Sequence, residues 1–107
     1  MLKGKKLLIL GCTVDEFQII DAAKGMGVYT IVTDNHMDWS QAPAKYRADE
    51  AWDISWSDVT TLKEKALLSG VDGVMAGYSE RRIECAIKLC RELKKPFYVD
   101  NEDILYK

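Results

Sequence analysis

The 107-residue sequence lacks the features that mark several common protein classes. It has neither a signal peptide nor a run of about 18 apolar residues, so we expect a soluble, cytoplasmic chain that does not enter a membrane. Lysine and arginine number 15 against 17 acidic residues, for a net charge of −2. No basic surface is therefore expected, which argues against a nucleic-acid partner because binding to phosphates requires one.

Metal-binding and disulfide patterns are also missing. The single histidine, His36, stands near Asp34 and Asp38 but has no cysteine partner at the spacing of a zinc site, so a solvated loop is favoured over a metal ligand. Of three cysteines, Cys85 and Cys90 lie on different sides of a predicted helix. That placement disfavours a disulfide and fits a reducing compartment.

Phosphate-binding glycine motifs are absent as well. No GK[ST] occurs, so there is no P-loop, and Gly11 is followed by Cys12-Thr13-Val14, so no GxGxxG can be written. Cys12 begins a helix, where an activated thiolate is possible. With no histidine near it in sequence, the simpler interpretation is that a small side chain fills a glycine's place.

The most informative segment is KLLILGCTV, from Lys6 to Val14. The apolar run from Lys6 to Leu10 does not alternate with polar residues, which is typical of a strand buried on both faces of a parallel sheet. Thr13 and Glu16 have the spacing of a capping box, which predicts a helix start. A buried strand, a glycine and a capped helix form a geometry that binds small ligands near the helix amides.

Strands and helices then alternate along the rest of the chain. The connection from Asn35 to Glu50 has no periodicity, but one helical turn is expected behind Pro43. Right-handed crossovers predict an α/β fold, a Rossmann-like three-layer sandwich with a parallel five-stranded sheet. The expected strands are 6–10, 29–33, 51–54, 73–76 and 97–99, and the expected helices are 15–26, a helix capped by Ser57 or Asp58 and ended by Gly70, and a helix from the 77–80 loop to Pro96.

A doubly wound strand order of 3-2-1-4-5 reverses between the first and fourth strands, and ligands bind at such a switch point. The turns at 11–14 and 77–80 should therefore face each other across one crevice. Six residues are candidates for substrate binding: Gly11, Cys12, Thr13, Gly77, Ser79 and Glu80.

Two carboxylates in this region each allow a second interpretation. Glu80 is the best polar candidate, although a carboxylate in a first helical turn also complements the helix dipole. Asp34 ends the second strand, where dinucleotide-binding folds place the carboxylate that holds a ribose, and we take it as a candidate cofactor-binding residue. A loop cap is the alternative for Asp34.

Several stretches together resemble one family. The segments KKLLILGCTVDEFQIIDAAKGMGVYTIVTD, APAKYRADEAWDI and GVDGVMAGYSE are similar to the pre-ATP-grasp domain of ATP-dependent carboxylate–amine ligases, nearest to members like the carbamoyl-phosphate synthase large chain. The family's strand turn commonly has two glycines, and here the second is Cys12. Positions matching as they stand are Asp34, Pro43, Ala44, Ala48, Asp49 and Glu80.

The resemblance implies a pre-ATP-grasp domain over residues 1–100 and the start of a connection at 101–107 to an ATP-grasp domain of the same polypeptide. ATP and magnesium are expected in that following domain and no cofactor in this chain, which would be inert alone and form one wall of a small-molecule substrate site. A free-standing Rossmann-like nucleotide- or metabolite-binding module is the alternative. A phosphoacceptor receiver domain is disfavoured, because Gly11-Cys12 replaces the acidic pair that it needs.

Overall fold

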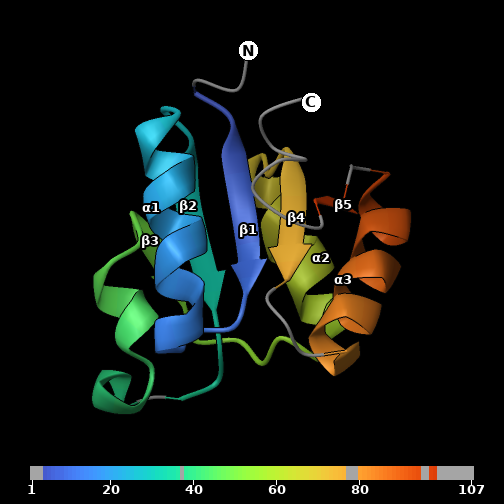
Figure 1. Cartoon of the computed structure of the whole chain (residues 1–107). Helices are drawn as coiled ribbons and strands as arrows, with labels where there is room; N and C mark the ends of the chain where they lie inside the picture. Colours follow the sequence, from blue (N-terminus) through green and yellow to red (C-terminus); the bar gives the residue numbers. More distant parts are fainter. Residues whose placement is uncertain (1–3, 37, 77–79, 95–96, 99–107) are drawn as a thin grey trace.

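The structure is a computed structural model that describes residues 4–36, 38–76, 80–94 and 97–98 (Figure 1). Its sheet has the order β3-β2-β1-β4-β5, and each pair of neighbouring strands is parallel. The doubly wound order and the central place of the first strand are thus as predicted. The strands are β1 (Lys6–Leu10), β2 (Tyr29–Thr33), β3 (Glu50–Trp52), β4 (Gly73–Ala76) and β5 (Phe97–Tyr98).

Alternate residues of β1 build two separate cores, because successive side chains of a strand point to opposite faces. Leu7 and Ile9 pack in a cluster with α1 (Phe17–Gly25). Leu8 and Leu10 pack in a cluster with α2 (Val59–Ser69) and α3 (Glu80–Leu93). Figure 1 shows α1 on one face of the sheet and α2 and α3 on the other. Burial on both faces explains why β1 is apolar from Leu7 to Leu10.

The two edge strands differ in detail from the prediction, and β3 begins at Glu50 rather than at Ala51. The five-strand sheet is met only in part, because β5 contributes two residues that pair with Val74 and Met75, whereas the other strands have three to five. β3 ends at Trp52 rather than at Ile54. There the Thr33 hydroxyl, instead of a backbone amide, donates a hydrogen bond of 2.6 Å to the Ile54 carbonyl. Val99 and residues 101–107 lie outside the described part.

The first helix also starts later than expected. A 3-10 turn, η1 (Val14–Glu16), precedes α1, which begins at Phe17 rather than at Asp15 and ends at Gly25 rather than at Met26. The helix starts late because the Glu16 amide donates to the Thr13 carbonyl, three residues back, and so tightens the turn.

The second helix follows the prediction, and the long connection follows it only at the turn behind Pro43. Asp58 caps α2 by accepting a hydrogen bond from the Thr61 amide, and Gly70 ends the helix in a left-handed conformation. The connection between β2 and β3 contains two 3-10 turns, η2 (Trp39–Gln41) and η3 (Pro43–Tyr46), the second of which is the predicted turn behind Pro43. Among the described residues, every helix is too short or too polar to cross a bilayer.

Candidate functional site

The carboxyl ends of the three central strands meet at one edge of the sheet. The last residue of β1, Leu10, is in register with Thr33 of β2 and with Ala76 of β4. The turn after β1, Asp34 after β2, and the end of β4 consequently lie side by side. This edge is the switch point at which open α/β sheets bind ligands.

An ion pair joins two of these segments. Glu16, at the end of η1, has no exposed surface, and its carboxylate accepts a hydrogen bond from Arg82 in the first turn of α3. The Arg82 side chain is 16 % exposed, and its Nη1 also lies 3.5 Å from the Leu10 carbonyl oxygen. The first turn of α3 therefore reaches across the end of β1, whereas residues 77–79 of the second predicted turn lie outside the described residues.

Gly11 lies directly against this pair. Its φ is +116°, in the region that favours glycine, and a Cβ there would collide with Arg82 Nη1 and Glu16 Oε1. The space beside the Gly11 backbone is therefore filled by the protein's own side chains. Gly11 is required by an internal contact, and the close approach of a ligand to this backbone is not needed to explain it.

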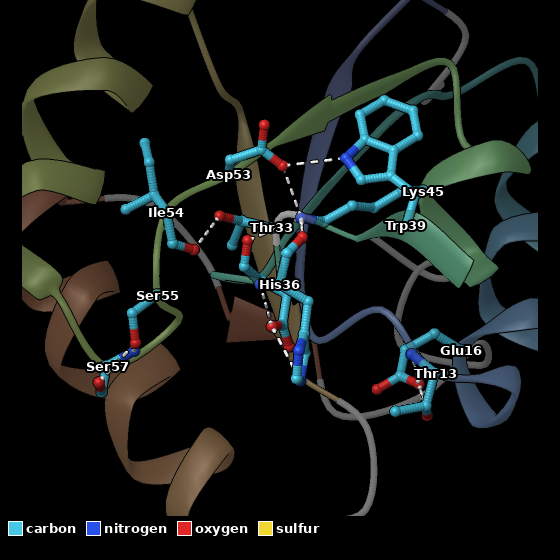
Figure 2. Close-up of polar contacts among 11 residues, drawn as sticks. Thr13, Glu16, Thr33, His36, Trp39, Lys45, Asp53, Ile54, Ser55 and Ser57 are labelled. Atoms are coloured by element: carbon cyan, nitrogen blue, oxygen red, sulfur yellow. Dashed lines mark hydrogen bonds and ion pairs between the residues drawn. The ribbon is translucent and has the colours of Figure 1, made fainter. Parts of the chain in front are cut away.

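Thr13 and Glu16 form one half of the predicted capping box. Figure 2 shows the two side chains together: Glu16 Oε2 accepts from the Thr13 amide at 3.2 Å and from the Thr13 hydroxyl at 2.5 Å. Glu16 thus binds Thr13 with one carboxylate oxygen and Arg82 with the other. A buried carboxylate with donors on both oxygens stabilises the turn without needing a ligand.

Cys12 is buried at this turn, with 1 % of its surface exposed. Burial first, and then the nearby negative charge of Asp34, raise the pKa of the Cys12 thiol to about 12. A thiol of this kind stays protonated at neutral pH, so the activated thiolate is not supported. The Cys12 carbonyl accepts a hydrogen bond from the Ala44 amide, which attaches η3 to the turn.

Asp34 is also largely buried, with 8 % of the residue exposed. One carboxylate oxygen, Oδ1, accepts from the His36 amide at 3.1 Å, so the predicted loop cap is present. The imidazole Nε2 of His36 lies 3.8 Å from the same oxygen, and its side chain is 58 % exposed. Asp34 therefore has a structural role through Oδ1 that leaves its other oxygen, Oδ2, available.

A buried lysine fixes the chain on either side of His36. Lys45, on η3, has a fully buried side chain whose ammonium donates to the Asp34 carbonyl at 2.9 Å, the His36 carbonyl at 2.7 Å and Asp53 Oδ1 at 2.7 Å. Figure 2 shows this ammonium between His36 and Asp53, with Trp39 beside them. Three donors meet three acceptors, so the buried charge is fully compensated.

Asp53 is shared by two partners. Besides Lys45, the indole Nε1 of Trp39 donates to Asp53 Oδ1 at 3.1 Å, and these contacts lower the pKa of the Asp53 carboxyl below its usual range. Trp39 in turn packs edge-on against Tyr46, with ring centroids 5.4 Å apart. The connection between β2 and β3 is thus held by its own side chains.

Of the other predicted site residues, only Glu80 lies within the described part of the chain. Glu80 begins α3 and is exposed, and its carboxylate makes no ion pair or hydrogen bond with the described residues. Gly77 and Ser79 fall outside the described part of the chain. The structure brings Gly11, Cys12, Thr13 and Asp34 together at one edge, and Arg82 places the start of α3 beside them.

Sequence reasoning missed the partners that build this edge. The sequence pattern singles out neither Arg82 nor Lys45 nor Asp53 as a site residue. A lysine behind a proline in an otherwise unpatterned connection carries no periodic signal, so its burial appears only when the fold is known. The described residues contain no group of three or more histidine, cysteine or acidic side chains able to hold a metal. The described side chains at this edge are mostly charged groups held by hydrogen bonds, an arrangement suited to binding.

Comparison with known proteins places this geometry in context. No protein-family model matches the sequence, and no curated protein sequence matches it either. Solved structures do match. The biotin carboxylase domain of Hydrogenobacter thermophilus 2-oxoglutarate carboxylase, in complex with MgADP, ADP and bicarbonate, is 25 % identical with a TM-score of 0.73, over 87 % of this chain and 22 % of that one.

Two further structures give the same picture. The biotin carboxylase subunit of pyruvate carboxylase is 27 % identical with a TM-score of 0.73, over 87 % of this chain and 22 % of its own. The ADP complex of N5-carboxyaminoimidazole ribonucleotide synthetase is 23 % identical with a TM-score of 0.70, over 91 % and 24 %. This chain spans about a quarter or less of these proteins. Its fold is that of the N-terminal, pre-ATP-grasp-like region of ATP-grasp enzymes.

Proposed function

We propose that this chain is the pre-ATP-grasp domain of an ATP-dependent ligase of the ATP-grasp superfamily, occupying residues 1–100. In this role it supplies one wall of the substrate site and has no activity alone. The observation that carries the proposal is the match over 87 % of this chain to only 22 % of a biotin carboxylase domain. The rest of that protein is available to bind the nucleotide.

The geometry of the described residues supports one wall of a substrate site rather than a complete site. The Gly11 to Thr13 turn, Asp34 and the start of α3 share one edge of the sheet, and Glu80 has an exposed carboxylate there. The described residues offer neither a phosphate-binding loop nor a metal-binding cluster, so they do not fit ATP and magnesium. Both belong, in this proposal, to a following ATP-grasp domain.

Within the ATP-grasp superfamily, we propose that the parent protein resembles the carbamoyl-phosphate synthase large chain. This assignment rests on the matched stretches around Asp34, Pro43 to Ala44 and Glu80. The solved structures similar to this chain include biotin carboxylases, one of them with bicarbonate. Bicarbonate is therefore the first acid to test with the complete protein.

The reading frame beyond codon 107, and the protein that it encodes, test the proposal. We expect several hundred further residues with a glycine-rich loop, and magnesium-dependent ADP release that requires both an acid, with bicarbonate tried first, and an amine. A frame that stops near codon 107, with saturable metabolite binding by the short chain, would instead establish the free-standing binding module.

A substitution at Glu80 tests the wall itself. In the full-length protein, Glu80→Gln should raise the KM of one substrate several-fold and leave the melting temperature nearly unchanged, because an exposed first-turn carboxylate contributes only about 0.3 to 1 kcal/mol through the helix dipole. Glu84→Gln, one turn later on α3 and also exposed, is the matched control. Unaltered turnover in Glu80→Gln would leave Glu80 a helix-start residue without a role in the site.

A further inference from the structure

The carboxylate of Asp34 has one oxygen without a partner. Oδ1 accepts from the His36 amide, whereas Oδ2 accepts no hydrogen bond from the described residues. The Asp34 side chain as a whole is 11 % exposed, so this carboxylate is largely but not completely removed from solvent. A buried acceptor left unpaired is costly, and proteins keep such groups where a ligand or water completes them.

The charges around Asp34 decide which ligand fits. The charged groups acting on the neighbouring Cys12 thiol are Asp34, Lys45, Glu16 and Arg82. Each of the two cations is engaged by a different carboxylate, Arg82 by Glu16 and Lys45 by Asp53. Among the described residues, Asp34 has no lysine or arginine partner at ion-pair distance. An anion at this position would be repelled by the negative charge of Asp34. A cation would be attracted by the same charge.

The same edge disfavours anion binding for a second reason. The space beside Gly11, in the turn after β1, is filled by Arg82 and Glu16. Arg82 is held there by Glu16 and by the Leu10 carbonyl, so its charge is already balanced. Glu80 adds another exposed carboxylate at the start of α3.

The backbone around Asp34 is rigidly held. Lys45 binds the Asp34 and His36 carbonyls, and the Asp34 amide donates to the Trp52 carbonyl at 3.2 Å. A carboxylate held in place loses little conformational entropy when it receives a donor, so its interaction with a ligand is correspondingly stronger.

We propose that Asp34 Oδ2 binds the protonated amine of a substrate at the carboxyl edge of the sheet. The inference rests on the proposed ligase function and names the substrate component that this wall holds: the amine rather than the acid. His36 Nε2 lies 3.8 Å from the other oxygen, Oδ1, on a side chain that is 58 % exposed.

The first test uses saturation-transfer NMR to measure how the full-length protein binds three small probes of similar size. Ethanolamine carries a cation, 1,2-ethanediol is neutral and glycolate is an anion. We expect ethanolamine to bind about tenfold or more tighter than the other two, since charge-assisted hydrogen bonds are about twice as strong as neutral ones. Equal binding of the three, or no binding of ethanolamine, would overturn the proposal.

The second test is Asp34→Asn, which keeps an oxygen to accept from the His36 amide. Ethanolamine affinity should fall about tenfold or more, with the melting temperature within a few degrees of wild type. Asp38→Asn is the matched control, because Asp38 also caps an amide two residues on, that of Ser40, but is exposed; its effect should stay within about twofold. Unchanged affinity in Asp34→Asn contradicts the proposal. If Asp34→Asn does not fold, the three-probe comparison on the wild-type protein decides.

These readouts separate the inference from the proposed function. Absence of magnesium-dependent ADP release refutes the ligase assignment whatever ethanolamine does. Conversely, ADP release with ethanolamine binding that Asp34→Asn does not weaken refutes only the role of Asp34.

Discussion

At the scale of single residues, the glycine in the turn after β1 is required by neighbouring side chains rather than by a bound ligand. A glycine ending a buried strand before a capped helix is typical of a loop where a ligand approaches the backbone. Here the space that Gly11 leaves is occupied by Glu16 and Arg82. The sequence predicts the glycine turn because it depends on local pattern. Arg82, which lies 66 residues from its partner, cannot be inferred from the pattern.

Gly11→Ala should destabilise the protein by about 2 kcal/mol or more. The backbone at position 11 has a φ of +116°, which alanine adopts only with strain, and such strain alone costs of order 1 to 3 kcal/mol. The added Cβ would also collide with both members of the ion pair. Gly25→Ala is the control, since Gly25 ends α1 with no atom within 4 Å of an added Cβ, and it should be neutral or stabilising by up to about 1 kcal/mol. Urea unfolding of both variants measures the difference. Equal effects would show that the collision is relieved at no cost.

Cys12 should resist alkylation in the folded protein. Its thiol pKa is raised to about 12, above the roughly 8.5 of an unfolded cysteine, so the thiolate is scarce until strongly alkaline pH. Iodoacetamide at pH 8 should leave Cys12 unmodified for hours in native buffer, and mass spectrometry of peptides should show it modified within minutes in 6 M urea. Rapid native labelling of Cys12 would restore the activated thiolate as a serious interpretation.

At the scale of elements, the buried strands were predictable and the connection between β2 and β3 was not. The bounds of β1, β2 and β4 agree with the apolar runs, because burial on both faces leaves a continuous signal. The connection from Asn35 to Asp49 is ordered instead by one ammonium and three acceptors distant in sequence. A lysine is normally exposed, so its residue type argues against the position that it occupies.

Lys45→Met should loosen this connection more than it unfolds the sheet. Methionine fills the stem's volume but leaves the Asp34 and His36 carbonyls without their donor, at a cost of about 2 to 4 kcal/mol. Hydrogen exchange should accelerate in residues 38–49 by about tenfold or more, with β1 and α3 changing less. Lys63→Met, which removes an exposed ion pair at 3.9 Å to Glu92, should change stability by less than about 1 kcal/mol. Similar effects of the two variants would mean that the Lys45 contacts add little.

At the scale of the whole molecule, the sequence was sufficient for the architecture and only partly sufficient for the site. Alternation of strands and helices predicted the parallel sheet and its order, and with them the edge where Gly11, Cys12, Thr13 and Asp34 meet. The charge pairing at that edge, Glu16 with Arg82 and Lys45 with Asp53, arises from tertiary contacts. It is this pairing that leaves Asp34 uncompensated, so the choice between amine and carboxyl ligands needed the structure.

The 107-residue chain alone should bind ATP no tighter than roughly millimolar and should not hydrolyse it, since it contains no phosphate-cradling motif. At the switch point the space beside Gly11 is filled by Arg82 and Glu16, and the carboxylate of Asp34 has no lysine or arginine partner among the described residues. A triphosphate is therefore repelled where a wall-forming domain would meet it. Calorimetric titration with MgATP measures this, alongside a circular dichroism melt to show that the sample is folded. The full-length protein, titrated in the same way, should bind ATP at micromolar concentration. Micromolar binding by the short chain would move the nucleotide site into this domain and favour the free-standing binding module over the ligase wall.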